Sequence, residues 1–404
     1  MNLSSIEQRV CQALQSRRAA LLDDLRLHVG IPTGLGHRPG LDETRERFAA
    51  RLAALGAKSE LIPGDPKPTW LWSGTIPPID ATESSPAVPP PTLIARRPTT
   101  GPRVLIAGHL DTVHDPASPF NKLKLNPNGL TATGPGCVDM KGGLVIAMAA
   151  LEALEEIGVR ASWSFLLNSD EETGSYHSDR ALAAAAREHD FGLALEPAMS
   201  KGELAIARGG SGQFMLDAFG KAAHVGRDFT AGVSAVAALA SGISAAAALS
   251  DPDAGLCVNV GPLQGGPATN VVPDRARAWG NVRFPTPDGA AKLQSGLRAI
   301  ARDGLPRLAV ETSFNRPAKP TTPAVEALAL RARAVAEDLD QSLPFAATGG
   351  VCDGNQLQTA GLPTIDTLGV RGGGLHTPDE WIELPSLVQR AQLLAVLVMR
   401  LANP

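Results

Sequence analysis

The sequence predicts an α/β fold, in which a mostly parallel sheet covered by helices is interrupted by an inserted α+β unit. Short continuous apolar runs such as RVLIAGHL (103–110) and SWSFLLNS (162–169) alternate with helical segments, which is typical of parallel strands buried on both faces. From about 205 to 316 the order becomes strand-helix-strand-strand-helix-strand, which suits a small α+β unit. We therefore predict one domain formed by 1–205 and 317–404, and a second formed by 206–316.

The N-terminal region predicts two helices around the loop IPTGLGHRPG (31–40). An amphipathic polar helix covers 1–25, and LDETRERFAARLAALG (41–56) continues at helical spacing until Gly56. The proline-rich stretch TIPPIDATESSPAVPPP (75–91) predicts an exposed, partly extended loop to which we assign no role. A strand, PTLIARR (91–97), follows it directly.

The remaining elements follow from periodicity and from glycine at helix ends. Helices are expected over 142–158, 179–190, 231–249, 288–302, 323–339 and 384–402. Further strands are expected over 191–197, 210–220, 275–284 and 361–369.

Composition excludes several classes of protein. Lys plus Arg total 37 against 41 Asp plus Glu, so the net charge of −4 does not favour nucleic-acid binding. No run of 18 apolar residues predicts a membrane span. The N-terminus lacks the features of a signal peptide, so we expect a cytoplasmic protein. The four cysteines form no CxxC pair, which argues against a disulfide scaffold or a cysteine zinc site.

Polar side chains gather where predicted parallel strands end, which is where open α/β sheets bind ligands. They are His109 and Asp111 after one strand, Asp170, Glu171 and Glu172 after the next, Glu196 after a third, and His376 in a late glycine-rich loop. Asp139 lies in another such loop, GPGCVDMKGG. Two His, one Asp and two Glu suit two adjacent cations bridged by a carboxylate. Such a pair, about 3.5–4 Å apart, clamps a water or hydroxide and polarises a carbonyl, while a spare glutamate acts as general base.

Each of these residues also has an ordinary structural interpretation. His109 alone could be a core histidine, and the carboxylate run could be a solvated helix start. The loop around Asp139 lacks the spacing of a phosphate-binding glycine loop. His114 is expected at the surface or rim. Cys137 and Cys352 lie near the proposed site, but the carboxylate set already explains hydrolysis without a thiol nucleophile.

The motifs GHLDTV, GPGCVDMKGG, NSDEETGS, LEPA and GLHTPDE resemble, in the same order, those of the co-catalytic zinc metallopeptidases. This family includes acetylornithine deacetylase, succinyl-diaminopimelate desuccinylase, aminoacylase, and di- and tripeptidases. GKAAHVG and ATNVVPD most resemble its folate-cleaving glutamate carboxypeptidases. The loop GGVCDG, which borders the substrate side in that family, departs from them, because Val351 and Cys352 replace a glycine and a small hydroxyl residue.

The resemblance implies a role for each candidate residue. The ligands would be His109, Asp139 (bridging), Glu172, Glu196 and His376, holding two Zn²⁺ per subunit, with Co²⁺ or Mn²⁺ as substitutes. Glu171 would be the general base and Asp111 the partner of His109. His224 would stabilise the tetrahedral oxyanion, and Asn270, Arg283 and Arg316 would hold the substrate carboxylate. The insertion would be a lid that also forms a homodimer.

The expected activity is hydrolysis of the amide bond of an N-acyl amino acid or a peptide with a free carboxylate. The alternatives are a deacylase of the acetylornithine or desuccinylase type, and a binding paralogue that has lost the chemistry. All proposed ligands and Glu171 are present, which argues against the paralogue.

Overall fold

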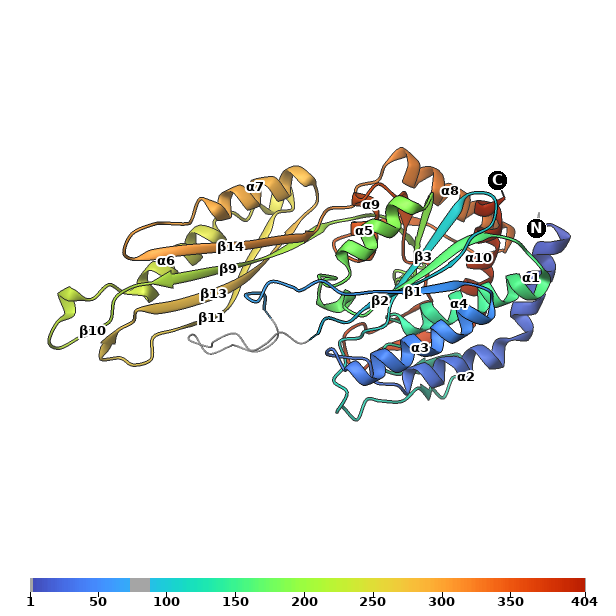
Figure 1. Ribbon diagram of the computed structural model, residues 1–404, viewed down its shortest axis with the longest axis horizontal. Coiled ribbons are helices and arrows are strands. Elements are labelled where there is room, and N and C mark those ends of the chain that lie inside the picture. The colour runs from blue at the N-terminus through green and yellow to red at the C-terminus, as the bar shows by residue number, and fades with distance from the viewer. Residues whose placement is uncertain (1–2, 73–87, 404) are drawn as a thin grey trace.

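A computed structural model of the chain describes residues 3–72 and 88–403. Figure 1 shows two bodies, a larger one built around a central sheet that holds both chain ends, and an elongated one built around a second sheet. None of the helices in these residues is long and apolar enough to cross a membrane.

The central sheet has six strands and is mostly parallel, as predicted. In spatial order they are β1 (Lys58–Ile62), β2 (Thr92–Arg97), β6 (Ser162–Asn168), β3 (Arg103–His109), β7 (Phe191–Ala194) and β16 (Thr364–Ile365). The last four run in parallel, and β1 and β2 add an antiparallel edge. In the register of β3 and β6, His109 lies opposite Asn168, so the carboxyl ends of these strands meet at one edge.

Helices bury both faces of this sheet, which explains the continuous apolar runs. Val104 and Ile106 of β3 belong to the largest core, and Leu105 and Ala107 belong to a separate core on the opposite face. The first core includes residues of α1 (Ser5–Ser16), α2 (Arg18–Val29), α3 (Arg38–Ala54), α4 (Lys141–Ile157), α8 (Pro323–Asp338) and α10 (Pro385–Ala402). The second includes residues of α5 (Asp179–Glu188) and α9 (Asp353–Thr359).

The second sheet is antiparallel, and its spatial order is β11 (Cys257–Gly265), β13 (Arg275–Phe284), β9 (Gly210–Phe219) and β14 (Arg307–Arg316). The helices α6 (Ala235–Ala247) and α7 (Pro287–Arg298) pack with Phe214 and Leu216 in a core of their own. The chain order β9-α6-β11-β13-α7-β14 confirms the predicted α+β pattern. The opposite face of β13 carries Arg277, Trp279 and Arg283 at alternate positions.

Within the described residues, the segments that lead into and out of the second sheet are joined by a β-bridge. Arg208 and Lys319 form an antiparallel bridge, in which each backbone N–H donates to the other residue's carbonyl oxygen, at 2.8 and 2.9 Å. Their side chains contact the two carboxylate oxygens of the buried Asp366. The predicted domain boundaries stay a prediction, but the outgoing and returning segments lie side by side here.

Small elements complete the fold. They are β8 (Leu204–Arg208) paired with β15 (Phe345–Thr348), β10 (Ala223–His224) paired with β12 (Val271–Val272), and a sheet of β17 (Gly372–Gly373), β18 (Trp381–Glu383), β5 (Thr131–Thr133) and β4 (Lys124–Leu125). Short 3₁₀ turns cover Glu171–Thr173, Phe229–Ala231 and Pro252–Ala254.

Two predicted elements differ most from the structure, and one lies mostly outside the described residues. The first helix is interrupted at Arg17, whose side chain contacts Glu152 and Glu156 of α4, and the break allows both α1 and α2 to pack against α4. The strand predicted over 361–369 shortens to Thr364–Ile365. Most of the proline-rich loop predicted over 75–91 lies outside the described residues.

Candidate metal centre

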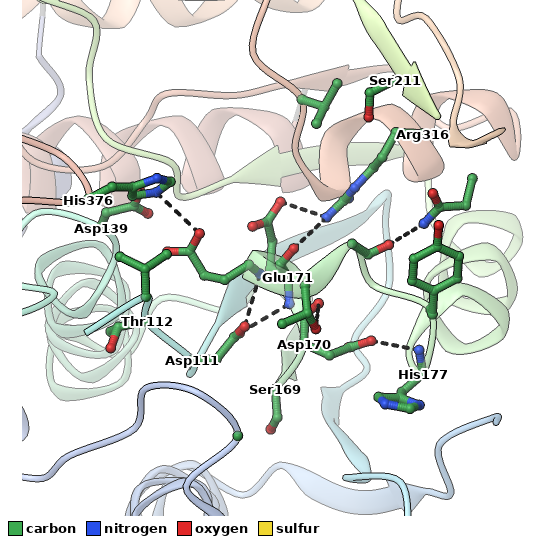
Figure 2. Close-up of a pocket in the computed structure, with 18 of the residues that line it drawn as sticks. Asp111, Thr112, Asp139, Ser169, Asp170, Glu171, His177, Ser211, Arg316 and His376 are labelled. Atoms are coloured by element: carbon green, nitrogen blue, oxygen red, sulfur yellow. Dashed lines mark hydrogen bonds and ion pairs between the residues drawn. The ribbon is translucent and has the colours of Figure 1, made fainter. Parts of the chain in front are cut away.

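The carboxyl ends of β3, β6 and β7 open into a cavity of about 2640 Å³. Eight of the residues that line it were predicted for the site: Asp111, Asp139, Glu171, Glu172, Glu196, Arg283, Arg316 and His376. Figure 2 shows Asp139 and His376 on one side of this group and Glu171 and Arg316 on the other. The structure therefore brings together side chains from seven separate segments.

His109 ends β3 and is almost fully buried. Its Nδ1 lies 2.9 Å from the backbone oxygen of Asp111, so this nitrogen donates and Nε2 carries a lone pair. Nε2 lies 3.3 Å from Oδ1 of Asp139. Two electron-pair acceptors therefore face each other, an arrangement that a cation or an added proton stabilises.

Asp139 lies between the two histidines. Its second oxygen, Oδ2, is 3.5 Å from Nε2 of His376, and the same nitrogen is 3.2 Å from Oε2 of Glu172. His376 has a φ of 63°, in the left-handed region that non-glycine residues rarely adopt. Hydrogen bonds to Asp139 and Glu172 raise the pKa of His376 to about 10, so a proton occupies this place when no cation does.

The donor set fits a bound cation. Ligand atoms of His109, Asp139 and Glu172 all lie within 4.8 Å of one another. Three buried atoms of this group, His109 Nε2, Asp139 Oδ1 and Glu172 Oε1, have no hydrogen-bond partner. Buried polar atoms in a native protein are normally satisfied, so these point to an ion. Imidazole and carboxylate ligands suit zinc and similar divalent metals.

Glu196 follows β7 and lines the same cavity. Burial and the neighbouring charges of Glu171 and Asp139 raise its pKa well above the usual value. A bound cation would stabilise the ionised form of a carboxylate that is surrounded by other acidic groups. Its predicted role as a ligand stays a prediction.

Asp111 holds the Glu171–Glu172 turn in place. Its two carboxylate oxygens accept the backbone N–H groups of Glu171 and Glu172, at 3.1 and 2.9 Å, and Oδ1 is 3.5 Å from Nδ1 of His109. Asp111 thus orients the imidazole of His109 through its backbone oxygen. Its carboxylate orients the turn that presents the two glutamates (Figure 2).

Glu171 is held by an arginine. Arg316 Nη2 donates to Glu171 Oε1 at 2.7 Å and to the Ser175 hydroxyl at 2.8 Å. Arg316 Nη1 contacts Asp353 and Gln356. Burial raises the pKa of Glu171 to about 8, although Arg316 and His109 oppose the rise. That value suits a group that accepts and returns a proton near neutral pH.

The predicted substrate residues are placed differently. Arg283 and Arg316 line the cavity, but both Nη atoms of Arg316 already have protein partners. Arg283 has no acidic partner within ion-pair distance in the part of the chain described, and burial and Arg316 lower its pKa, as expected where an anion is missing. His224 and Asn270 are exposed, lie beside each other on the β10–β12 pair, and are not among the described residues that line the cavity.

A buried glutamate supports the loop that carries Asp139, and no role was predicted for it. The carboxylate of Glu380 accepts the backbone N–H groups of Gly136, Val138 and Asp139, at 2.8, 2.9 and 3.1 Å. It also lies 2.6 Å from Nε2 of His114. His114 was expected at the surface or rim, yet its side chain is only 11 % exposed because it contacts Glu380. Glu380 is the last residue of the motif GLHTPDE, and this position was the only sign in the sequence of its role.

The two thiols near the site are poor nucleophiles. Cys137 and Cys352 are fully buried, and burial raises the pKa of both well above the ordinary value. Both thiols therefore stay protonated.

Val351 lines the cavity, as expected of the GGVCDG loop.

Comparison with known proteins decides the family. The model of peptidase family M20/M25/M40 matches residues 105–400. The chain belongs to this family. It is a hydrolytic metallopeptidase or amidohydrolase, as the motifs predicted. Family M20/M25/M40 is metal-dependent, and the cluster around Asp139 is the candidate site for the metal.

Several relatives of this M20/M25/M40 peptidase are known. It is 25 % identical to carboxypeptidase G2 of Pseudomonas sp. (strain RS-16), over 96 % of this chain and 91 % of the relative. It is 28 % identical to succinyl-diaminopimelate desuccinylase 2 of Shewanella loihica, over 74 % and 85 %. A tripeptidase structure from Staphylococcus aureus aligns with a TM-score of 0.73 at 22 % identity, over 96 % and 99 %, and supports the fold.

Proposed function

We propose that this M20/M25/M40 peptidase hydrolyses the amide bond between an acyl group or peptide and an amino acid whose carboxylate is free, in the manner of a glutamate carboxypeptidase. The observation that carries the proposal is the placement of Glu171 beside the His109–Asp139–Glu172 cluster, in a cavity that also exposes the unpaired Arg283. A metal cluster, a base and a cation for the substrate carboxylate are the parts that such a reaction needs.

Two divalent cations, zinc by the chemistry of the ligands, would be held by Asp139 as the shared ligand. His109 and Glu196 would complete one position, and Glu172 and His376 the other. Bound cations of this kind polarise the substrate carbonyl and lower the pKa of a water. His109 lies near one carboxylate oxygen of Asp139 and His376 near the other, which supports Asp139 as a ligand shared by both cations.

Glu171 takes a proton from the attacking water and delivers it to the leaving amine. Arg316 fixes the carboxylate of Glu171 through Oε1, which leaves Oε2 to exchange the proton. Asp111 holds the backbone of the same turn, so the base has little freedom to swing away from the substrate.

Arg283 binds the carboxylate of the leaving amino acid. A guanidinium binds a carboxylate through two parallel hydrogen bonds, and Arg283 faces the cavity from β13. Arg316 was predicted for the same role. In this proposal its positive charge acts on Glu171, with which it forms an ion pair.

His224 and Asn270 serve the cavity of a partner subunit in a homodimer formed through the second sheet. They lie together, exposed, and apart from the cavity of their own chain. Mixing E171Q with H224A protein tests this assignment, because each variant is inactive alone and a mixed dimer holds one complete site. If activity does not return on mixing, the two residues act within their own chain.

The decisive experiment measures amino-acid release from a panel of N-acyl amino acids, including pteroyl-glutamate, N-acetylornithine and N-succinyl-diaminopimelate. Each substrate is tested with zinc-loaded and with chelated protein. Metal-dependent release, greatest with glutamate, supports the proposal. Preference for the ornithine or diaminopimelate substrates would identify a deacylase. Lack of release from every substrate, with metal bound, would favour the binding paralogue.

The cytoplasmic location stays a prediction.

A further inference from the structure

A second, smaller cavity lies beside the loop that carries Asp139, and the proposed function does not use it. Its volume is about 210 Å³, and it is lined by the end of α2 and by parts of the segments 30–33, 112–122 and 135–141. Among the described lining residues, only Thr112 belongs to both this cavity and the one at the metal cluster. The second cavity is therefore a distinct space next to the metal centre.

A buried lysine lines this second cavity. Lys141 is only 2 % exposed, and its Nζ donates to the backbone oxygen of Ile31 at 2.7 Å. An ammonium group has three N–H donors, and in the part of the chain described no carboxylate lies within ion-pair distance of Nζ. Burial lowers the pKa of Lys141 to about 7, although the charge of Glu380 opposes the fall. An anion at Nζ would accept its remaining hydrogen bonds and favour the charged form.

A second buried donor lines the same space. Thr33 is 1 % exposed, lies two residues after Ile31, and has a hydroxyl group without a hydrogen-bond partner among the described residues. Buried hydroxyl groups in native proteins are normally satisfied. The acidic residue that lines this cavity, Asp115, is exposed, and its Oδ1 accepts the backbone N–H of Ala117. The buried polar groups of the cavity therefore suit an anion.

The other walls indicate the class of anion. Most of them are apolar, and they are formed by Val29, Pro32, Pro116, Phe120 and Pro135. The ammonium group of Lys141 excludes a metal ion, and apolar walls favour a ligand with a hydrocarbon part over a strongly hydrated inorganic anion. The volume is below the about 300–1,000 Å³ of typical ligand pockets, so the ligand must be small.

We propose that this second cavity binds a small carboxylate, with its charged group on Lys141 and Thr33 and its carbon atoms against the apolar walls. The inference goes beyond the proposed function and does not depend on it, because none of the proposed metal ligands, nor Glu171 or Arg283, lines this cavity.

Calorimetric titration of the zinc-loaded protein with isobutyrate at pH 6 tests the proposal. The variant T33V keeps the shape of the side chain and breaks no hydrogen bond within the described residues, so its fold should be preserved. We expect T33V to weaken isobutyrate binding about tenfold, the effect of one hydrogen bond to a charged group, and K141M to abolish it. Isobutyramide, which has the same shape but no charge, should bind the wild type much more weakly.

Two control variants separate this cavity from the rest of the molecule. Thr44 is as buried as Thr33 and also has an unpartnered hydroxyl among the described residues, but it lines neither cavity, so T44V should bind isobutyrate normally. R283A should do the same, because Arg283 lines only the cavity at the metal cluster. Loss of binding in R283A with normal binding in T33V would place the carboxylate at the metal cluster and overturn the proposal. Unchanged binding in both T33V and K141M, or no binding to the wild type, would also overturn it.

Discussion

Replacing Glu380 with glutamine should weaken metal binding although Glu380 is not a proposed ligand. Its Oε1 accepts the N–H groups of Val138 and Asp139, and its Oε2 accepts that of Gly136 and contacts His114. A glutamine keeps one of these oxygens as an acceptor. At least one buried N–H then faces an amide NH₂ and loses its partner, at a cost of about 1–3 kcal/mol.

This cost falls on the loop that presents Asp139. We expect E380Q to reduce the free energy of unfolding of the metal-free protein by about 1–3 kcal/mol in urea titrations. Metal affinity should fall about 10- to 100-fold, as for other residues that orient metal ligands. Competition with a chromophoric chelator measures the affinity, and elemental analysis gives the number of bound ions.

Glu383 provides a matched control three residues away. It is paired with Arg371, and its side chain is 35 % exposed, so E383Q should cost less than about 1 kcal/mol and leave metal affinity unchanged. Wild-type metal affinity in E380Q, or an equal loss in E383Q, would refute the argument that Glu380 positions Asp139.

Three further predictions concern the metal centre. E171Q should bind metal normally but lose about 10²- to 10⁴-fold in kcat, and full activity would show that Glu171 is not the base. D139A should lose both ions together in elemental analysis, whereas loss of one ion would exclude a shared ligand. Because His376 has a pKa of about 10 without metal, its imidazole is protonated at neutral pH and a cation must displace that proton. The apparent metal affinity should therefore rise with pH between pH 6 and 8, by up to tenfold per unit for each proton displaced, and a flat profile in chelator competition would contradict this.

The sequence predicted the elements whose pattern is long and unambiguous. The apolar runs of β3 and β6 and the helix that ends at Gly158 match the structure closely because burial on both faces leaves a continuous signal. Short elements such as β16 and α9 are formed by tertiary packing, which local pattern does not reveal. The interruption at Arg17 likewise depends on contacts with α4.

The residues of the site also fall into those that the local sequence predicts and those that depend on tertiary contacts. His109, Asp139 and Glu172 were predictable because each follows a recognisable strand or glycine-rich loop, and the structure places them together. The support that Glu380 gives to the Asp139 loop joins residues more than 240 positions apart, so no local pattern encodes it. Arg316 was expected to face substrate, and only the folded chain shows that Glu171 and Asp353 occupy its Nη atoms.

The side-by-side passage of Arg208 and Lys319 gives the protein a modular architecture. The segment between them leaves and re-enters the larger body through one β-bridge, and its core shares no residues with the cores around the central sheet. A tight turn in place of that segment would join its two ends, but it would also remove the contacts that Arg316 makes with Glu171 and Asp353. Exchanging the second sheet for that of a relative would likewise change one polar wall of the cavity and the arginine that holds Glu171, while the candidate ligands His109, Asp139 and Glu172 stay in the larger body.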